Sequence, residues 1–171
     1  NQNGIPEKWI EKMRNSMSRL TPQFSANRTV REYTEKYYLP AAENYLRRAV
    51  NKGAEGIRIT NAQYELKNKW NEISITDVKT QRIKNGYSFS ALVFLNGIDQ
   101  NKVLVELYAN GKDGNNPERI KMNIQSSENN MQSFTADVIT ARPASDYTIR
   151  IIPNYEGIAV PLENNLILWQ H

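Results

Sequence analysis

The apolar residues between Pro6 and about Val50 recur every three or four positions, which is the spacing of one helix face. We expect a first helix whose apolar face carries Ile10, Met13, Met17 and Leu20. Pro6 suits the first position of that helix, where a missing N–H costs nothing. The helix is expected to end at Thr21-Pro22, because proline disfavours helical geometry in the residue before it.

A second helix is expected to begin at Ser25, whose hydroxyl can accept a hydrogen bond from a free N–H group of the first turn. Pro40 lies within this helical run and predicts a kink or an interruption, because proline has no N–H to donate. Residues 51–60 contain glycines and are typical of a linker, which a third, shorter helix follows from about Asn61 to Trp70. The apolar face of the second helix consists of Val30, Tyr33, Tyr37, Ala41 and Tyr45.

After Trp70 the apolar residues alternate with their neighbours at a period of two, which is the pattern of β-strands. Pairs of residues that tolerate positive φ, such as Asn85-Gly86 and Asn96-Gly97, separate the alternating runs. About seven short strands are expected, around residues 75–78, 87–95, 103–109, 120–124, 134–138, 147–151 and 166–169.

The helical spacing before Trp70 and the alternating pattern after it predict an α+β chain of two parts. Residues 1–70 form a helical segment whose apolar faces cannot be buried on one another alone. Residues 71–171 form an antiparallel β-sandwich domain of the immunoglobulin-like or fibronectin-like type, because short strands separated by frequent turns are typical of that architecture.

Composition and charge narrow the classes of function. The net charge is +4, but the Lys and Arg residues are interleaved with Glu rather than clustered, so no nucleic-acid partner is expected. No run is long and apolar enough to predict a membrane partner. The absence of cysteine excludes thiolate chemistry and fits a cytoplasmic protein. The one histidine, His171, is the last residue, so neither a histidine-based triad nor a two-histidine metal site is expected in this sequence.

Catalytic motifs are missing as well. The sequence has no glycine-rich phosphate loop and no GxSxG elbow, and its carboxylates are dispersed, so an independent enzyme is the weakest hypothesis. Aromatic rings can stack on sugars, which makes Tyr108 and Trp70 possible glucan contacts. Packing at the junction of the two parts is the alternative for Trp70, and burial is expected for Trp169.

Residues 4–42, GIPEKWIEKMRNSMSRLTPQFSANRTVREYTEKYYLPAA, resemble the end of the catalytic region of the α-glucan phosphorylases, in their short bacterial and archaeal branch. That branch carries a Trp-containing helix, a turn with Pro and Phe, an R-x-V-x-E-Y helix and the run Y-Y-L-P-A. These correspond here to Trp9, Pro22, Phe24, residues 28–33 and residues 37–41. Residues 141–170 resemble the closing strands of the same enzymes.

The resemblance implies the C-terminal portion of a retaining α-1,4-glucan phosphorylase, which converts glucan and phosphate to glucose 1-phosphate. Residues 1–70 would then be the C-terminal end of a GT-B-type catalytic region of two lobes, and this chain would help to clamp the lobes and to contact glucan. The implied contacts with the upstream catalytic domains of the same polypeptide are Phe24, Arg28, Arg31, Tyr33, Tyr37 and Tyr38.

The resemblance also implies a pyridoxal phosphate cofactor in the parent enzyme, held by a lysine whose motif this sequence lacks. No catalytic, cofactor-binding or metal-binding residue is therefore expected here, and the isolated chain is expected to be inactive. Because the sequence does not begin with Met, we expect a piece of a longer polypeptide, whose tyrosine-bearing patch would be exposed or would form a homodimer. The alternative is a non-catalytic carbohydrate-binding or protein-interaction β-sandwich module.

Overall fold

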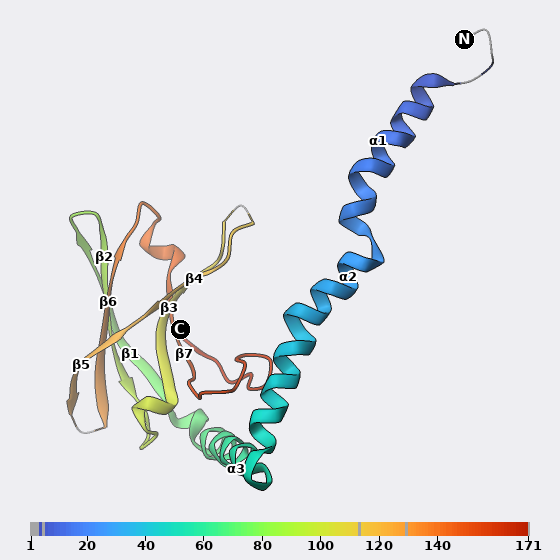
Figure 1. Ribbon diagram of the computed structural model, residues 1–171. Helices are drawn as coiled ribbons and strands as arrows, with labels where there is room; N and C mark the ends of the chain where they lie inside the picture. Colours follow the sequence, from blue (N-terminus) through green and yellow to red (C-terminus); the bar gives the residue numbers. More distant parts are fainter. Residues whose placement is uncertain (1–3, 5, 113, 129, 171) are drawn as a thin grey trace. The chain divides into compact units, whose positions relative to one another are not determined.

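The computed structural model describes residues 4, 6–112, 114–128 and 130–170, and shows an α+β chain in which helices precede strands (Figure 1). The chain forms two compact units, Asn1–Gly56 and Ile57–His171. The helices are α1 (Glu7–Phe24), α2 (Ala26–Tyr33), the π-helix η1 (Thr34–Tyr38), α3 (Leu39–Lys69) and the short 3-10 helix η2 (Trp70–Glu72). The strands are β1 (Ser74–Ile83), β2 (Gly86–Phe94), β3 (Val103–Ala109), β4 (Glu118–Lys121), β5 (Asn123–Glu128), β6 (Met131–Ile139), β7 (Thr148–Pro153) and β8 (Leu168–Trp169).

The first helix runs past its predicted end. α1 includes Pro22 and ends at Phe24, so the predicted stop at Thr21-Pro22 was wrong. The chain leaves the helix at Ser25, whose backbone is extended (φ −74°, ψ 145°). The Ser25 hydroxyl accepts a hydrogen bond from the N–H of Arg28 at 3.3 Å, which confirms Ser25 as the N-cap of α2.

The interruption expected near Pro40 is confirmed, and it takes the form of a π-helix. Residues 34–38 form the wider turn, and the N–H of Leu39 donates to the carbonyl of Thr34, five positions earlier. Pro40 follows this turn and cannot donate to an earlier carbonyl, and the wider turn lets the helix continue past it into α3.

The linker predicted over residues 51–60 is mostly helical, so that prediction was wrong. Only Val50 to Gly53 leave helical geometry, and Asn51, Lys52 and Gly53 adopt positive φ. Asparagine and glycine tolerate this left-handed conformation, which accounts for a kink at this point. From Ile57 onward α3 belongs to the second unit, and its residues Ile59, Ala62 and Leu66 are buried there.

The strands form two antiparallel sheets of four strands each, in the orders β1-β2-β6-β5 and β4-β3-β7-β8. The strand predicted over 120–124 is in fact two strands, β4 and β5, which belong to different sheets, so the described residues form eight strands rather than seven. Met122 lies between them, almost fully buried, and its N–H donates to the carbonyl of Val105 at 2.9 Å. β3 has the bounds that the sequence predicted.

One core cluster joins the two sheets and the end of α3. It contains alternate residues of the central strands, such as Phe89, Phe134, Leu107 and Ile149. Trp70 belongs to this cluster and is only 7% exposed. The second unit therefore has a complete hydrophobic core of its own.

Replacing Gly86 by alanine should strongly destabilise this unit. A Cβ atom at Gly86 would lie 1.8 Å from the carbonyl oxygen of Val138 on the paired strand β6, so the strands must move apart. We expect the Gly86→Ala variant to lower the free energy of unfolding by about 2 kcal/mol or more in urea denaturation.

The matched control is Gly97→Ala, at a turn glycine with φ of 70° and no atom within 4 Å of the added Cβ. This substitution adds only backbone strain and should cost about 1 kcal/mol. Equal losses for the two variants would show that the close approach at Gly86 does not exist in solution.

Candidate functional site

The helical unit presents most of the predicted interdomain residues to solvent. Phe24 is 74% exposed, Tyr37 is 57% exposed and Tyr38 is 64% exposed. Tyr33 and Arg31 are also exposed, and Arg28 is half-buried. Between residues 6 and 56 no described residue is buried.

The tyrosines form a connected cluster on this surface. The ring centroid of Tyr33 lies 5.6 Å from that of Tyr37 and 6.3 Å from that of Tyr38, and both pairs are tilted. Such pairs stabilise each other modestly beyond their burial. Arg28 lies with its guanidinium carbon 5.9 Å from the centre of the Phe24 ring.

A shallow hollow of about 470 Å³ accompanies the tyrosine cluster, and charged side chains border it. Glu32 lies between two cations, with its carboxylate 3.4 Å from Arg28 Nε and 3.7 Å from Lys36 Nζ. One carboxylate at the border thus faces two cations, which leaves one positive charge in excess, and the rings are not covered. We call this surface, Phe24, Arg28, Arg31, Tyr33, Tyr37 and Tyr38, the tyrosine face; nothing in the structure tests its predicted contact with catalytic domains.

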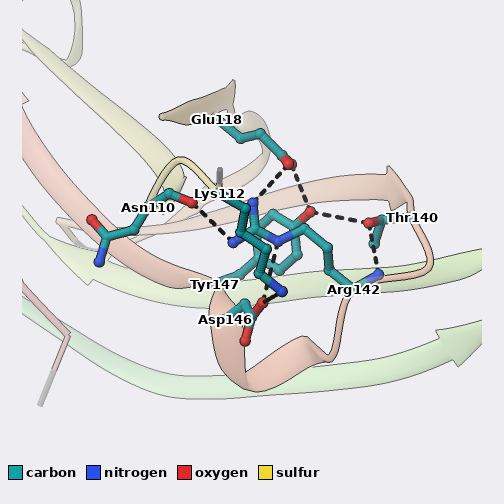
Figure 2. Close-up of polar contacts among 7 residues, drawn as sticks. All are labelled: Asn110, Lys112, Glu118, Thr140, Arg142, Asp146 and Tyr147. Atoms are coloured by element: carbon teal, nitrogen blue, oxygen red, sulfur yellow. Dashed lines mark hydrogen bonds and ion pairs between the residues drawn. The ribbon is translucent and has the colours of Figure 1, made fainter. Parts of the chain in front are cut away.

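The most extensive polar cluster of the second unit surrounds Arg142 (Figure 2). The guanidinium of Arg142 donates to Glu118 Oε1 at 2.8 Å, to Asp146 Oδ2 at 3.2 Å and to the carbonyl of Asn110 at 3.0 Å. Lys112 Nζ pairs with Asp146 Oδ2 at 2.8 Å. These residues come from β4 and from the loops that follow β3 and β6, so the cluster fastens the two loops to the sheet.

Tyr147 completes the cluster from its buried position before β7. Its hydroxyl donates to Glu118 Oε2 at 2.7 Å, and the Thr140 hydroxyl oxygen lies 3.3 Å away. The guanidinium carbon of Arg142 lies 5.5 Å from the centre of the Tyr147 ring. The ring and the guanidinium therefore hold the Glu118 carboxylate from two sides.

The electrostatics favour the charged forms of the acids in this cluster. The hydrogen bond from Tyr147, followed by that from Arg142, holds the pKa of Glu118 below its ordinary value. Lys112, and after it Arg142, lowers the pKa of Asp146. Burial raises the pKa of the Tyr147 hydroxyl. Each acid is ionised and paired, so the cluster offers no free base or nucleophile and is suited to a structural role.

A second charge pair lies on the other face of β3 and β7 from the core. Glu106 and Arg150 are paired in the sheet register, and both are buried. Arg150 Nε donates to Glu106 Oε1 at 2.7 Å. The guanidinium carbon of Arg150 lies 4.1 Å from the centre of the Tyr108 ring and 5.1 Å from that of Trp169. The two rings cover the charge pair and shield it from water.

The positions of the aromatic rings determine which of the candidate glucan contacts are accessible. Trp70 lies in the core, so its ring is not available for stacking on a sugar, and packing is its role. Tyr108 is half-buried, and one side of its ring is occupied by Arg150. Trp169, for which burial was expected, is 36% exposed because β8 is an edge strand.

Sequence reasoning missed both polar clusters. Glu106 and Arg150 are far apart in the sequence, and only the register of β3 with β7 brings them together. Arg142 and Asp146 are four positions apart, but in a loop that spacing does not indicate a contact. His171 lies outside the described residues.

No group of three or more His, Cys, Asp or Glu side chains that could hold a metal ion occurs in the part of the chain that the structure describes. Among the same residues, no helix combines the length and the apolar character that crossing a bilayer requires.

Comparison with known proteins supports the resemblance to the α-glucan phosphorylases that the sequence motifs indicated. Residues 70–171 match the family model for the glycogen phosphorylase C-terminal domain. The chain is 26% identical to a glycogen phosphorylase of Mycobacterium tuberculosis (strain CDC 1551 / Oshkosh) over 179 aligned residues, which cover 97% of this chain and 21% of that protein. It is 24% identical to a maltodextrin phosphorylase of Thermococcus litoralis, over 95% of this chain and 20% of that protein.

The chain thus spans about a fifth of the length of these relatives. The alignments extend over the helical unit as well as the strands, since they cover nearly the whole chain. No solved structure gives a significant match.

The lowered pKa of Glu118 makes stability depend on pH. A carboxyl group whose pKa is lower in the folded state stabilises the fold above its unfolded pKa, and this contribution is lost as pH falls through the folded value. We expect wild-type stability to fall between about pH 5 and pH 2, and the Glu118→Gln variant to show a shallower fall. Urea denaturation midpoints measured across that range provide the test.

The control is Glu156→Gln, at an exposed glutamate whose carboxylate makes no hydrogen bond or ion pair with the described residues. This variant should keep the wild-type pH dependence. If the Glu118→Gln variant loses stability at low pH as steeply as the wild type does, the hydrogen bond from Tyr147 and the pair with Arg142 do not form in solution.

Proposed function

Because the chain belongs to the family of the glycogen phosphorylase C-terminal domain, we propose that it is the C-terminal portion of a retaining α-1,4-glucan phosphorylase. That enzyme converts glucan and phosphate to glucose 1-phosphate. The observation that carries the proposal is the family match over residues 70–171, together with alignments to named phosphorylases that continue through the helices.

The contribution of this chain is to clamp the catalytic lobes rather than to perform the reaction. Support comes from the tyrosine face, whose rings are exposed although large aromatic side chains favour burial. In this proposal the face lies against the upstream catalytic domains of the same polypeptide, and Arg28 and Arg31 pair with polar groups at its border. An isolated chain would instead expose the face or form a homodimer through it.

Catalysis in this proposal depends on a pyridoxal phosphate group held elsewhere in the parent enzyme. A lysine that forms a Schiff base is usually desolvated, so that its pKa falls. None of the described lysines is buried, and Lys102, which is partly covered, forms an ion pair with Glu65. The residues present do not fit this cofactor, and the chain supplies no step of the reaction.

The two sheets are proposed to form an immunoglobulin-like sandwich. The orders β1-β2-β6-β5 and β4-β3-β7-β8 correspond to the ABED and C′CFG arrangements of that fold. Tyr147 stands two residues before Ile149, at the entry to β7, which is the position of the tyrosine at the same corner of immunoglobulin domains. Its hydroxyl contacts the side chains of Glu118 and Thr140. Lack of cysteine fits a cytoplasmic location for the parent enzyme.

A non-catalytic carbohydrate-binding module is the second candidate function. The exposed ring of Trp169, beside the half-buried Tyr108, favours it, since rings of this kind can stack on sugars. The two candidates differ in what the helices contact, so the helices provide the test.

In the longer polypeptide that carries this segment, the Tyr33→Ala/Tyr37→Ala double variant should release glucose 1-phosphate from maltoheptaose and phosphate more slowly. Loss of two interface rings should weaken the docking of the helices by about 1 kcal/mol or more. We therefore expect the rate to fall at least about fivefold. The isolated chain should release none, even with pyridoxal phosphate added.

Tyr64→Ala is the matched control, because Tyr64 is a helical tyrosine that is 69% exposed but lies in the second unit, outside the tyrosine face. It should retain the wild-type rate. Phosphorolysis by the isolated chain, or a double variant as active as the Tyr64→Ala control, would contradict the proposed function.

A further inference from the structure

The sheet β1-β2-β6-β5 carries a polar groove on the face opposite its core. Ser88 and Ser90 alternate with the buried residues Phe89 and Ala91, so their side chains point away from the core. The sheet register pairs Ser90 with Thr135 on the neighbouring strand. These three short hydroxyl side chains line a hollow with a volume of about 650 Å³, which falls within the range of ligand sites in proteins.

The groove owes its shape to the sizes of the side chains. The floor, on the central strands β2 and β6, has only short side chains. Longer amide side chains stand on the two edge strands, Gln81 on β1 and Gln125 with Asn123 on β5. Since neighbouring strands lie about 4.8 Å apart, the groove with its two edge strands spans about 14 Å, which suits an extended ligand rather than a small compact one.

The hydrogen-bonding groups of the groove are unused by the protein. Among the described residues, none of the seven polar side chains that line it makes a hydrogen bond or ion pair with another protein group. By contrast, the polar groups beneath Tyr108 and Trp169 are already engaged, because Arg150 is bonded to Glu106 and covered by both rings. The groove is therefore the surface on which a ligand would find free donors and acceptors.

We propose that this groove binds a chain of neutral sugar residues, an α-1,4-glucan. The inference rests on the proposed function for the identity of the sugar. Serine and threonine hydroxyls and amide groups both donate and accept, which matches the hydroxyl groups of a sugar. No lysine or arginine lines the groove, so nucleic acid and other polyanions are disfavoured.

Asp137 is the one charged group among the side chains that line the groove. It lies beside Ser88 in the register of β2 and β6, and its side chain is exposed. A carboxylate accepts stronger hydrogen bonds from hydroxyl groups than a neutral acceptor does. Asp137 would therefore hold two neighbouring hydroxyls of a sugar, and it would repel a phosphorylated one.

The test is a titration of the 171-residue chain with maltoheptaose, followed by two-dimensional ¹H–¹⁵N NMR. With no aromatic ring in the groove, we expect millimolar affinity, and the largest shift changes at Ser88, Ser90 and Thr135. The Thr135→Arg variant fills the floor and should weaken binding by at least about tenfold. Asp137→Asn leaves the shape unchanged and should weaken it by about threefold.

The matched control is Thr148→Arg, the same substitution on the other sheet, beside Tyr108 in the register of β3 and β7. It should bind as the wild type does. If Thr135→Arg fails to fold, as its NMR spectrum would show, the conservative Asp137→Asn and Gln81→Ala variants carry the test, because both side chains are exposed.

Three results would overturn the inference. They are an absence of shift changes at millimolar maltoheptaose, shift changes centred on Tyr108 and Trp169, or a loss of binding in Thr148→Arg but not in Thr135→Arg. None of these results alters the phosphorolysis assay of the longer polypeptide, so failure of the groove is distinguishable from failure of the proposed function.

Discussion

The helices before Gly56 carry large apolar side chains that this unit has no interior to bury. Trp9, Met17, Phe24 and Tyr38 are each more than half exposed, and no described residue between positions 6 and 56 is buried. Each such side chain forgoes about 1.5–3 kcal/mol of favourable burial. Since isolated helices are marginal in water, tertiary contacts normally supply most of their stability. The helical unit therefore has the sequence of a packed element and lacks the surface to pack against.

The second unit differs from the helical unit, because it buries large apolar side chains in a core of its own. One cluster joins both sheets, Trp70 and Leu66, and ion pairs fasten the loops around it. The buried pair of Glu106 and Arg150 is shielded by rings, and the acids around Arg142 are paired. Within these two clusters the pairing leaves no free base or nucleophile. By contrast, the polar side chains that line the groove on the β1-β2-β6-β5 sheet make no hydrogen bond or ion pair with other described residues.

Local signals in the sequence predicted most helices and strands. The contacts between residues far apart in the sequence could not be predicted from it. The cap at Ser25, the interruption before Pro40 and the bounds of β3 each depend on a few neighbouring residues. The helix through Pro22 and the helical residues after Gly53 were missed, because Pro and Gly signals were taken as stops where the chain tolerates them. The split between β4 and β5 depends on the sheet that each strand joins, and the alternation of apolar residues does not contain that information.

The candidate functional residues also divide into those that local sequence predicted and those that it did not. The residues of the tyrosine face were predicted from the resemblance of residues 4–42, and Tyr33 and Tyr37 among them also follow the helical repeat. The Arg142 cluster, the Arg150 pair and the groove bring together residues from two to four strands or loops, so no local sequence motif predicts them. Trp70 is buried, in agreement with the packing interpretation, whereas Trp169 is more exposed than expected because β8 lies at a sheet edge.

The most direct test is amide hydrogen exchange of the isolated chain, measured by mass spectrometry at a concentration where sedimentation shows a monomer. If the helical unit needs an outside surface, peptides from Glu7–Phe24 and Ala26–Tyr33 should exchange nearly as fast as an unfolded chain. Peptides from β2, β3, β6 and β7 should exchange far more slowly. Protection of the helices equal to that of the strands, in the monomer, would contradict the account.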